Sequence, residues 1–292
     1  MIEVLTESIK IKTRADYTVS VIVLKKTAKK IYSSSVLGKP MSEWVLGATK
    51  GYMSKVVEYD TKLDSKEFIK PFLEPTDYTL VLYAHTPLIT RGVVAGIVEY
   101  VTMRESKATK LPIGYMVKND YLKTTKDIMF DSVYNFHLDA FYEVEDAKQL
   151  KYVTSVLSSR INTFYMENGV TIEGSDTVVI EPSVRISSGV TIMSHNTLKG
   201  NTSIGEGTVI KEKNVLEDCT IGKGCLVSNS NISRSTLYDG VCVGSYCEIL
   251  DSVLKEDVVV NKYSTIESRT IRKKTVVPER STLVLASKEK KC

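Results

Sequence analysis

Aliphatic residues return at a regular interval through the C-terminal part of the chain. They stand at every sixth position as far as Leu216 and at intervals of five or six residues after it. An α-helix repeats about every 3.6 residues and a strand about every two, so this spacing is typical of a hexapeptide repeat. The series comprises Ile180, Ile186, Ile192, Leu198, Ile204, Ile210, Leu216, Ile221, Val227, Ile232, Leu237, Val243, Ile249, Leu254, Val260, Ile266, Ile271, Val277 and Leu283.

A second series, made mostly of small residues, lies two positions before these aliphatic residues. It includes Val184, Val190, Asn196, Thr202, Thr208, Asn214, Cys219, Cys225, Ser230, Ser235, Val241, Cys247, Ser252, Val258 and Ser264. A coil of three short parallel strands needs this alternation of large and small residues. We therefore predict a left-handed parallel β-helix over residues 169–287, with about six coils of about eighteen residues each.

Two asparagines of the small series make this prediction specific. Asn196 and Asn214 are eighteen positions apart, so they should stack directly in successive coils. Their amides could then hydrogen-bond from coil to coil inside an apolar interior. A prism with flat faces and an open end also favours a closed oligomer, and we expect a homotrimer.

The chain before the repeat alternates between strand and helix patterns. Buried strands are predicted at Tyr17–Leu24 and Thr79–His85, with helices from Pro40 to about Val57 and from Arg91 to Met103. This order favours a doubly wound parallel α/β sheet, in which ligands bind beyond the carboxyl ends of the strands.

Less regular segments follow these four elements. Short strands are plausible at 113–117 and 132–137, and one long helix is predicted from about Glu145 to Met166. The Asn168-Gly169 pair is a helix stop signal. The predicted organisation is an α/β domain over residues 1–145, a linking helix over 146–168, and the β-helix.

Composition excludes several classes of function. The formal net charge is +4, with 39 Lys and Arg against 35 Asp and Glu, so no broad nucleic-acid surface is implied. The first residues lack a signal-peptide core, and no apolar run is long enough to span a bilayer. We therefore expect a cytoplasmic protein with no membrane partner. Cys219, Cys225 and Cys247 fall in the inward series, which indicates packing rather than metal binding.

Several segments together resemble the bacterial bifunctional enzyme family N-acetylglucosamine-1-phosphate uridylyltransferase/glucosamine-1-phosphate acetyltransferase. They are VLGKPMSEWVL at 36–46, VLYAHTPLIT at 81–90, HLDAFYEVED at 137–146, SSRINTFYMENGVTI at 158–172 and VGSYCEIL at 243–250. The resemblance implies a nucleotidyltransferase-like first domain that joins a uridylyl group to a sugar phosphate, followed by an acetyltransferase β-helix. It implies a nucleotide sugar or sugar phosphate as ligand.

The segment that the resemblance implies for binding the nucleotide phosphates differs in this chain. Where the family has a glycine-rich loop, this chain reads VIVLKKTAKK, with no glycine between Leu24 and Leu37. Without glycine the backbone loses easy access to positive φ and close approach to phosphate. Lys25 and Lys26 are the candidate phosphate ligands in its place, since they begin a basic cluster that continues at Lys29 and Lys30. Lys39, in the GKP segment, matches the family and is a third substrate-binding candidate.

The metal site that the resemblance implies is altered as well. The family's aspartate falls on His85, and its asparagine falls on Glu145. Magnesium prefers carboxylate and water oxygens, whereas a His85–Glu145 pair is conceivable for manganese. The alternative interpretation is structural: a histidine hydrogen-bonded in a turn, and a glutamate stabilised at a helix N-terminus.

The acetyltransferase half also departs from the family. A lysine that meets the acceptor sugar there is Leu250 here, and the family's later histidine segment is absent. His195 is the only histidine of the repeat, and its position indicates an exposed turn. We therefore expect a diverged sugar-1-phosphate nucleotidyltransferase-type protein with weak or no catalysis, which retains affinity for a sugar nucleotide. The alternatives are a trimeric scaffold or regulatory protein, an active enzyme using magnesium or manganese, and a hexapeptide acyltransferase.

Overall fold

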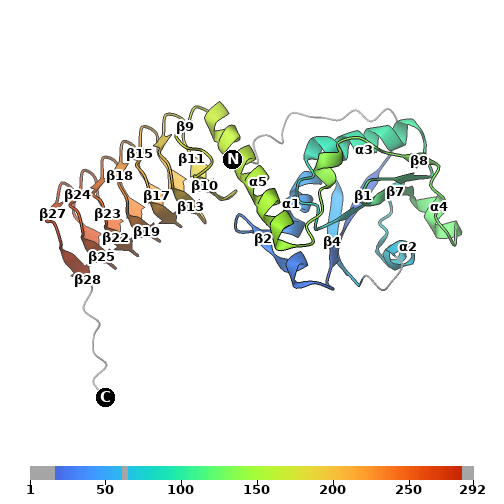
Figure 1. Ribbon diagram of the computed structural model, residues 1–292, viewed down its shortest axis with the longest axis horizontal. Coiled ribbons are helices and arrows are strands. Elements are labelled where there is room, and N and C mark those ends of the chain that lie inside the picture. Colours follow the sequence, from blue (N-terminus) through green and yellow to red (C-terminus); the bar gives the residue numbers. More distant parts are fainter. Residues whose placement is uncertain (1–16, 61–64, 285–292) are drawn as a thin grey trace, which may run out of the picture. The chain divides into compact units, whose positions relative to one another are not determined.

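The computed structural model describes residues 17–60 and 65–284 (Figure 1). The chain divides into two compact units that meet within one helix, the first ending at Val156 and the second beginning at Leu157. The predictions for the first sixteen residues and for the end of the β-helix beyond residue 284 lie outside the described residues. In the described part of the chain, every helix is too short or too polar to cross a bilayer.

The N-terminal unit is built on one mixed six-stranded sheet with the order β4-β1-β5-β7-β6-β8. Strands β4, β1 and β5 are parallel, and β7 runs antiparallel to both of its neighbours. The strands are β1 Val19–Lys26, β4 Met53–Tyr59, β5 Tyr78–Tyr83, β6 Ala108–Lys110, β7 Tyr115–Lys118 and β8 Ser132–Val133, with a small hairpin of β2 Ser35–Val36 and β3 Lys39–Pro40. The helices of this unit are α1 Met41–Ala48, α2 Ser65–Ile69, α3 Arg91–Met103 and α4 Asn119–Thr124, and α5 Ala147–Glu167 continues into the second unit.

Alternation along β1 explains why the sheet is covered on both faces. Val21 and Val23 pack in one cluster with residues of α1 and α3, whereas Ile22 and Leu24 pack in a second cluster with residues near α2 and α4. Successive side chains of a strand point to opposite faces, so a strand buried on both sides reads as a continuous apolar run. This is the pattern from which the strand was predicted.

The predicted strand at Thr79–His85 and helix at Arg91–Met103 are confirmed as β5 and α3. Two other predictions for this unit are wrong. The helix expected to run from Pro40 to about Val57 ends at Ala48, and the chain turns at Gly51, whose φ is +106°, into β4. The sheet is mixed rather than parallel, because β7 returns antiparallel between β5 and β6.

Helix α5 begins and ends where the sequence indicates. The amide of Gln149 donates to the Asp146 carboxylate at 2.8 Å, and the Gln149 side chain accepts from the amide of Glu145 at 2.7 Å. This reciprocal cap satisfies amides that have no partner within the helix. At the other end Gly169 takes φ +82°, and the amide of Val170 bonds the carbonyl of Tyr165 at 3.0 Å.

The C-terminal unit is a left-handed parallel β-helix of hexapeptide repeats, as predicted. Figure 1 shows its three sheets as columns of short arrows, with seven, six and seven strands in the described chain. Its strands are β9 Thr171–Ile172, β10 Val179–Ile180, β11 Arg185–Ile186, β12 Thr191–Ile192, β13 Thr197–Lys199, β14 Ser203–Ile204, β15 Val209–Ile210, β16 Val215–Glu217, β17 Thr220–Ile221, β18 Leu226–Val227, β19 Asn231–Ser233, β20 Thr236–Leu237, β21 Cys242–Val243, β22 Glu248–Leu250, β23 Val253–Leu254, β24 Val259–Val260, β25 Thr265–Glu267, β26 Thr270–Ile271, β27 Val276–Val277 and β28 Thr282–Val284.

Strand register follows the aliphatic series. Leu198 pairs with Leu216, Leu216 with Ile232 and Ile232 with Ile249, so the coil shortens from eighteen residues to sixteen and then settles at seventeen. The shorter intervals pass through corners such as Asp218 and Asp251, whose φ values are 54° and 47°. Left-handed backbone tightens the corner, and aspartate adopts it more readily than most side chains.

The asparagine stack is present. The Asn214 side chain donates to Oδ1 of Asn196 at 3.0 Å, and the amide of Asn214 donates to the same oxygen at 2.8 Å. One coil further, the amide of Ser230 donates to Oδ1 of Asn214 at 2.9 Å. Both asparagines are fully buried, so these bonds compensate for desolvation of their amides.

The first coils are covered by the second half of α5. The Asn162 side chain donates to the carbonyls of Ser175 at 2.7 Å and Val178 at 2.9 Å, and the Tyr165 hydroxyl donates to the carbonyl of Val184 at 2.6 Å. These side chains satisfy backbone groups that would otherwise be unpaired at an open end. Part of the predicted linking helix therefore serves as the cap.

Candidate functional site

A cluster of ionisable side chains lies at the carboxyl ends of β1 and β5, where the sequence predicts ligand binding. Lys26 is the last residue of β1, and His85 follows β5 by two residues. The segment before α5 runs beside them, since the amide of Val144 donates to the carbonyl of His85 at 2.8 Å. That bond places the side chains of Glu143 and Glu145, on either side of Val144, among the cationic groups of the cluster. We call His85, Lys26, Lys29, Tyr32, Glu143 and Glu145 the carboxyl-edge cluster.

His85 is the buried centre of this cluster, with only 1% of its surface exposed. Its Nε2 lies 2.7 Å from Oε1 of Glu143. Burial lowers the pKa of His85, and the hydrogen bond from Glu143 acts in the opposite direction without overcoming it. A neutral imidazole that donates from Nε2 to the carboxylate fits this environment. Nδ1 is then an acceptor, and no group among the described residues hydrogen-bonds it.

Lys26 is held by the same carboxylate and by two aromatic rings. Its Nζ lies 3.9 Å from Oε1 of Glu143, and 5.5 Å and 5.4 Å from the ring centroids of Tyr32 and Tyr83. An ammonium over aromatic faces is stabilised by the ring quadrupoles. The ammonium of Lys26, which the sequence suggests as a phosphate ligand, therefore already has partners within the α/β unit.

Glu145 completes the cluster with a different set of partners. Tyr32 donates its hydroxyl to Oε1 at 3.1 Å, and Nζ of Lys29 lies 3.4 Å from Oε2. The Tyr32 hydrogen bond and the charge of Lys29 lower the pKa of Glu145, and the charge of Glu145 in turn raises the pKa of Lys29. Glu145 therefore stays ionised, and it faces a lysine and a tyrosine.

The other two substrate-binding candidates lie elsewhere. Lys25 points to the opposite face of β1 from Lys26, and its Nζ lies 3.2 Å from the Glu58 carboxylate of β4. Lys39 lies in the β2–β3 hairpin, where its Nζ is 5.7 Å from the Trp44 ring centroid. Within the described residues, the contacts of Lys25 and Lys39 lie outside the carboxyl-edge cluster.

Glu143 is the functional residue that sequence reasoning missed. It bonds His85 directly, whereas the resemblance directed attention to Glu145. The two glutamates are separated by one residue in an extended segment, and that spacing is the signal that could have placed both on one side.

The described donor set does not fit magnesium. One of the two predicted ligands is an imidazole, which the ion accepts poorly, and the carboxylates beside it are paired with Lys26 and Lys29. Within the described residues no group of three or more His, Cys, Asp and Glu side chains could hold a metal. Glu145 already accepts from Tyr32 and pairs with Lys29, so a manganese ion at His85 and Glu145 would compete with these two partners.

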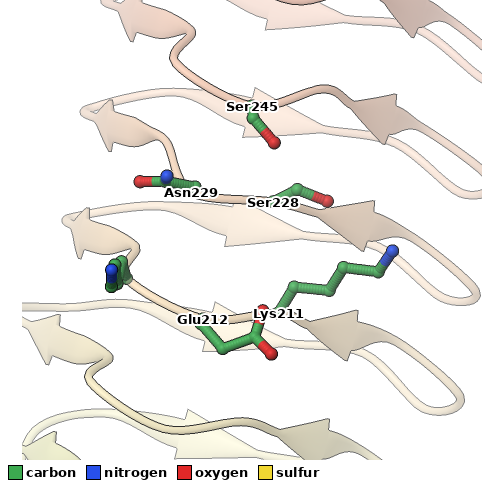
Figure 2. A pocket seen from close by; sticks show the side chains of 6 residues that line it. Lys211, Glu212, Ser228, Asn229 and Ser245 are labelled. Carbon is green, nitrogen blue, oxygen red and sulfur yellow. The ribbon is translucent and has the colours of Figure 1, made fainter.

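A second candidate site lies on the β-helix. It is a hollow of about 320 Å³, lined by Lys211, Glu212, Lys213, Ser228, Asn229 and Ser245. Figure 2 shows these side chains on successive coils of the β-helix. On the next coils at this corner, Tyr246 and Tyr263 stack face to face at 5.1 Å, and Arg280 lies 5.7 Å from the Tyr263 ring. The hollow contains no histidine or cysteine, so it offers binding groups and lacks an obvious general base.

The remaining β-helix residues discussed from the sequence are His195, Leu250 and the three inward cysteines. His195 is an exposed turn residue with φ +61°, and its amide donates to the Thr177 hydroxyl at 2.9 Å. Leu250 ends strand β22 and pairs with Ser233 and Glu267. Cys219, Cys225 and Cys247 are buried packing residues, and burial raises the pKa of each thiol.

The C-terminal unit thus defines the structural class: a left-handed parallel β-helix of hexapeptide repeats. Residues 209–289 match the family described as GlmU-like, C-terminal hexapeptide. The chain is 36% identical over 77 residues to the bifunctional protein GlmU of Latilactobacillus sakei subsp. sakei (strain 23K) and 38% identical over 77 residues to that of Bifidobacterium longum subsp. infantis. Each match covers 26% of this chain and 17% of the relative, so the chain matches about a sixth of those proteins.

Solved structures give a distant likeness. The acetyltransferase domain of PglB from Neisseria gonorrhoeae FA1090, in complex with acetyl coenzyme A, aligns over 93% of this chain and 97% of that chain with a TM-score of 0.36 and 12% identity. GDP-perosamine N-acetyl transferase from Caulobacter crescentus aligns over 45% of this chain and 62% of that chain, with a TM-score of 0.34 and 12% identity. Likenesses of this size carry no argument. The matches to the hexapeptide family and to the GlmU proteins support the hexapeptide region and give no support to a nucleotidyltransferase role.

Proposed function

We propose that this protein is a diverged, non-catalytic relative of the sugar-1-phosphate nucleotidyltransferases. In this proposal three copies associate through their β-helices into a homotrimer. The homotrimer is a scaffold that carries three α/β units. The observation that carries it is the carboxyl-edge cluster, in which Glu143 and Glu145 occupy the groups that would otherwise meet phosphate or metal.

Physical reasoning supports the loss of catalysis. Phosphoryl transfer depends on positioning and on neutralising charge around the transferred group. Here Glu143 draws Lys26, and Glu145 draws Lys29, so an incoming nucleotide would have to displace two carboxylates from the cationic groups. The phosphates of a nucleotide and the two glutamates are all negatively charged, so repulsion between them would oppose binding of the nucleotide.

The β-helix supports the scaffold part of the proposal. Its described strands leave flat sheet faces, and its first coils are covered by α5 rather than by solvent. Flat faces of a rigid prism suit association with identical prisms. Light scattering on the purified protein should give three times the mass of one chain, and a monomer would contradict the scaffold.

The catalytic part is tested by pyrophosphate release. The protein is incubated with UTP and glucosamine 1-phosphate or N-acetylglucosamine 1-phosphate, with magnesium, manganese or zinc in separate reactions. We expect no release above that of a Glu145→Gln variant with any metal. Metal-dependent release that is lost in the Glu145→Gln variant would instead establish the alternative, an active enzyme that uses His85 and Glu145.

A second candidate function is acyl transfer on the β-helix. It is favoured by the hollow on the β-helix, whose lining residues are shown in Figure 2. Thermal unfolding with acetyl coenzyme A tests it: we expect no rise in melting temperature. A rise that is lost in a Lys211→Glu variant, which removes a cation at the edge of the hollow, would favour the acyltransferase.

A further inference from the structure

One of the three sheets of the β-helix has an apolar column on its outer surface. The sheet runs from β9 to β27, and from β12 onward the second residue of each strand is buried in the interior. Successive side chains of a strand point to opposite faces, so the first residue of each strand faces outward. From β15 to β27 these outward residues are Val209, Leu226, Cys242, Val259 and Val276, which we call the apolar column.

The apolar column is continuous from coil to coil. Strand register places each of its residues directly beside the next. Neighbouring strands lie about 4.8 Å apart, so the column is roughly 19 Å long. Its side chains are partly exposed, and that of Val276 is 60% exposed. Figure 1 shows the stacked strands on which the column lies.

The other two sheets have mostly polar residues at the same position. In the sheet from β11 to β26 they are Arg185, Ser203, Thr220, Thr236, Val253 and Thr270, and in the sheet from β10 to β28 they are Val179, Thr197, Val215, Asn231, Glu248, Thr265 and Thr282. A contiguous exposed apolar patch is typical of an interaction surface. One face of the prism therefore differs from the other two in the way an interface differs from solvent-facing surface.

The corner at which the chain leaves this sheet adds two exposed rings. Tyr246 and Tyr263 are 59% and 49% exposed, and their ring centroids are 5.1 Å apart. Both have left-handed backbone, with φ of 62° and 59°, which is unfavourable for a bulky side chain. At the corner where the chain enters the sheet, glycine takes this conformation, as at Gly224 and Gly240. Tyrosine is enriched at protein interfaces, so the two rings widen the contact surface that the apolar column begins.

Charges at the two edges of this sheet match each other. We call the edge at which the strands begin the entry edge and the edge at which they end the exit edge. A three-fold axis in front of the sheet brings the entry edge of one copy next to the exit edge of its neighbour, at the same coil. At the coil of β24 the entry edge has Glu256 and Asp257, and the exit edge has Lys262. Opposite charges therefore meet at this coil.

The neighbouring coils fit the same arrangement. At the coil of β15 the entry edge has Glu206, which also pairs with Lys223 of its own edge at 3.5 Å, and the exit edge has two lysines and one glutamate at 211–213. At the coils of β18, β21 and β27 the exit edge has no net charge. Like net charges thus meet at none of these five coils, and complementary edges set the height at which two copies pair.

We propose that the apolar column, together with Tyr246 and Tyr263, is the interface through which copies of this chain associate, with this sheet facing the three-fold axis. The inference rests on the homotrimer of the proposed function and adds which of the three prism faces is buried in it. The partner is a second copy because the two edges of one sheet complement each other. An identical prism also repeats the spacing of the column coil by coil.

Light scattering of the whole protein and its variants tests the choice of face. Leu226→Glu places a carboxylate from each copy in the middle of the interface, and its mass should fall to one third of that of the unsubstituted protein. Thr236→Glu, at the same strand position of another sheet and likewise partly exposed, is the matched control and should remain trimeric. Val276→Glu, at the most exposed residue of the column, should raise the concentration for half-dissociation at least tenfold.

Cys242 gives a second measurement within the apolar column. With Cys292→Ser added to each protein, Cys242 is the one cysteine of the described chain that is not buried. Its reaction with N-ethylmaleimide, assigned by peptide mass mapping, should be at least tenfold faster in Leu226→Glu than in Thr236→Glu. Circular dichroism establishes that each variant is folded, and Val276→Glu takes the place of Leu226→Glu if the latter does not fold.

The possible results separate this interface from the homotrimer itself. A monomeric unsubstituted protein would contradict both. A trimer that survives Leu226→Glu and Val276→Glu, with Cys242 equally reactive in all variants, would leave the homotrimer standing and overturn the choice of face. Dissociation by Thr236→Glu alone would move the interface to the sheet from β11 to β26.

Discussion

The two units of this chain are stabilised by different arrangements of contacts. In the β-helix each coil contacts its neighbours through the same few positions, as the pairing of Leu198 with Leu216 and of Leu216 with Ile232 illustrates. In the α/β unit the decisive contacts join distant segments, as His85 and Glu143 do. A repeated local contact is visible in sequence as a period, whereas a single long-range contact leaves no such trace. The comparison predicts how each unit responds to substitution.

The largest effect is expected in the interior of the β-helix. Leu216→Ala removes a fully buried side chain between two coils, and a column this narrow has little freedom to collapse around the cavity. We expect a loss of about 2–5 kcal/mol in the free energy of unfolding, measured by urea titration. The neighbouring Val215→Ala, at a side chain 38% exposed, should cost less than about 1 kcal/mol. Equal losses for the two variants would contradict the assigned register.

The asparagine stack should contribute a smaller amount. Asn214→Leu leaves the amide of Ser230 without its acceptor and removes one of the two donors to Oδ1 of Asn196, inside a buried column. We expect a loss of about 1–3 kcal/mol in the same urea titration, because each orphaned polar group retains its desolvation cost. Asn231→Leu, at an exposed asparagine of strand β19, is the control and should change stability little. A stable Asn214→Leu protein would show that the stack is dispensable.

In the α/β unit the corresponding substitution is Glu143→Ala. It leaves the buried Nε2 of His85 without its acceptor, and we expect the α/β unit to lose about 1–2 kcal/mol of stability. Glu58→Ala removes the partner of Lys25 in an exposed pair and should cost less than about 1 kcal/mol. Trp44 is the single tryptophan of the chain and lies in the α/β unit, so its intrinsic fluorescence reports on that unit. A loss no greater than that of Glu58→Ala would exclude His85 as the centre of the cluster.

The smallest effect concerns pH. Burial holds the folded pKa of His85 below its ordinary value of 6.5, so as pH falls through 6.5 the unfolded chain takes up a proton that the folded chain does not. Stability of the α/β unit should therefore decrease below that pH, by at most about 1.4 kcal/mol per pH unit, until the folded pKa is reached. His85→Gln keeps a donor to Glu143 without titrating there, and its Trp44-monitored stability should vary less between pH 6.5 and pH 5. An identical slope in both proteins would assign the titration to another group.

The same difference explains what could be predicted from the sequence. The hexapeptide period predicts the β-helix, and the eighteen-residue interval predicts the Asn196–Asn214 bond, because in a solenoid sequence distance is spatial distance. In the first domain, β5 and α3 were predicted because each has a strong local pattern. Strand β4 was missed because its MSKVVEY segment follows helix α1 after only a short turn at Gly51. His85 could be identified as a candidate from the sequence. Its partner Glu143 could not, because only folding brings the two residues together.

The family resemblance identified the correct edge of the sheet, at the carboxyl ends of its strands. It did not identify which side chains contact each other there. His85 and Glu145 were chosen because they align with that family's ligands, and the structure gives each of them a partner that the alignment does not contain. Lys25 was chosen with Lys26, although adjacent residues of a strand face opposite ways. The two-residue period of a strand is enough to place Lys25 and Lys26 on opposite faces of the sheet.

The most direct test of the account is calorimetric titration of the carboxyl-edge cluster with UTP and magnesium. Because Glu143 and Glu145 already neutralise Lys26 and Lys29, we predict no binding to the unsubstituted protein. We also predict measurable binding once Glu143→Gln and Glu145→Gln are added. Tight UTP binding with the glutamates in place, lost on substitution of Lys26, would contradict the account.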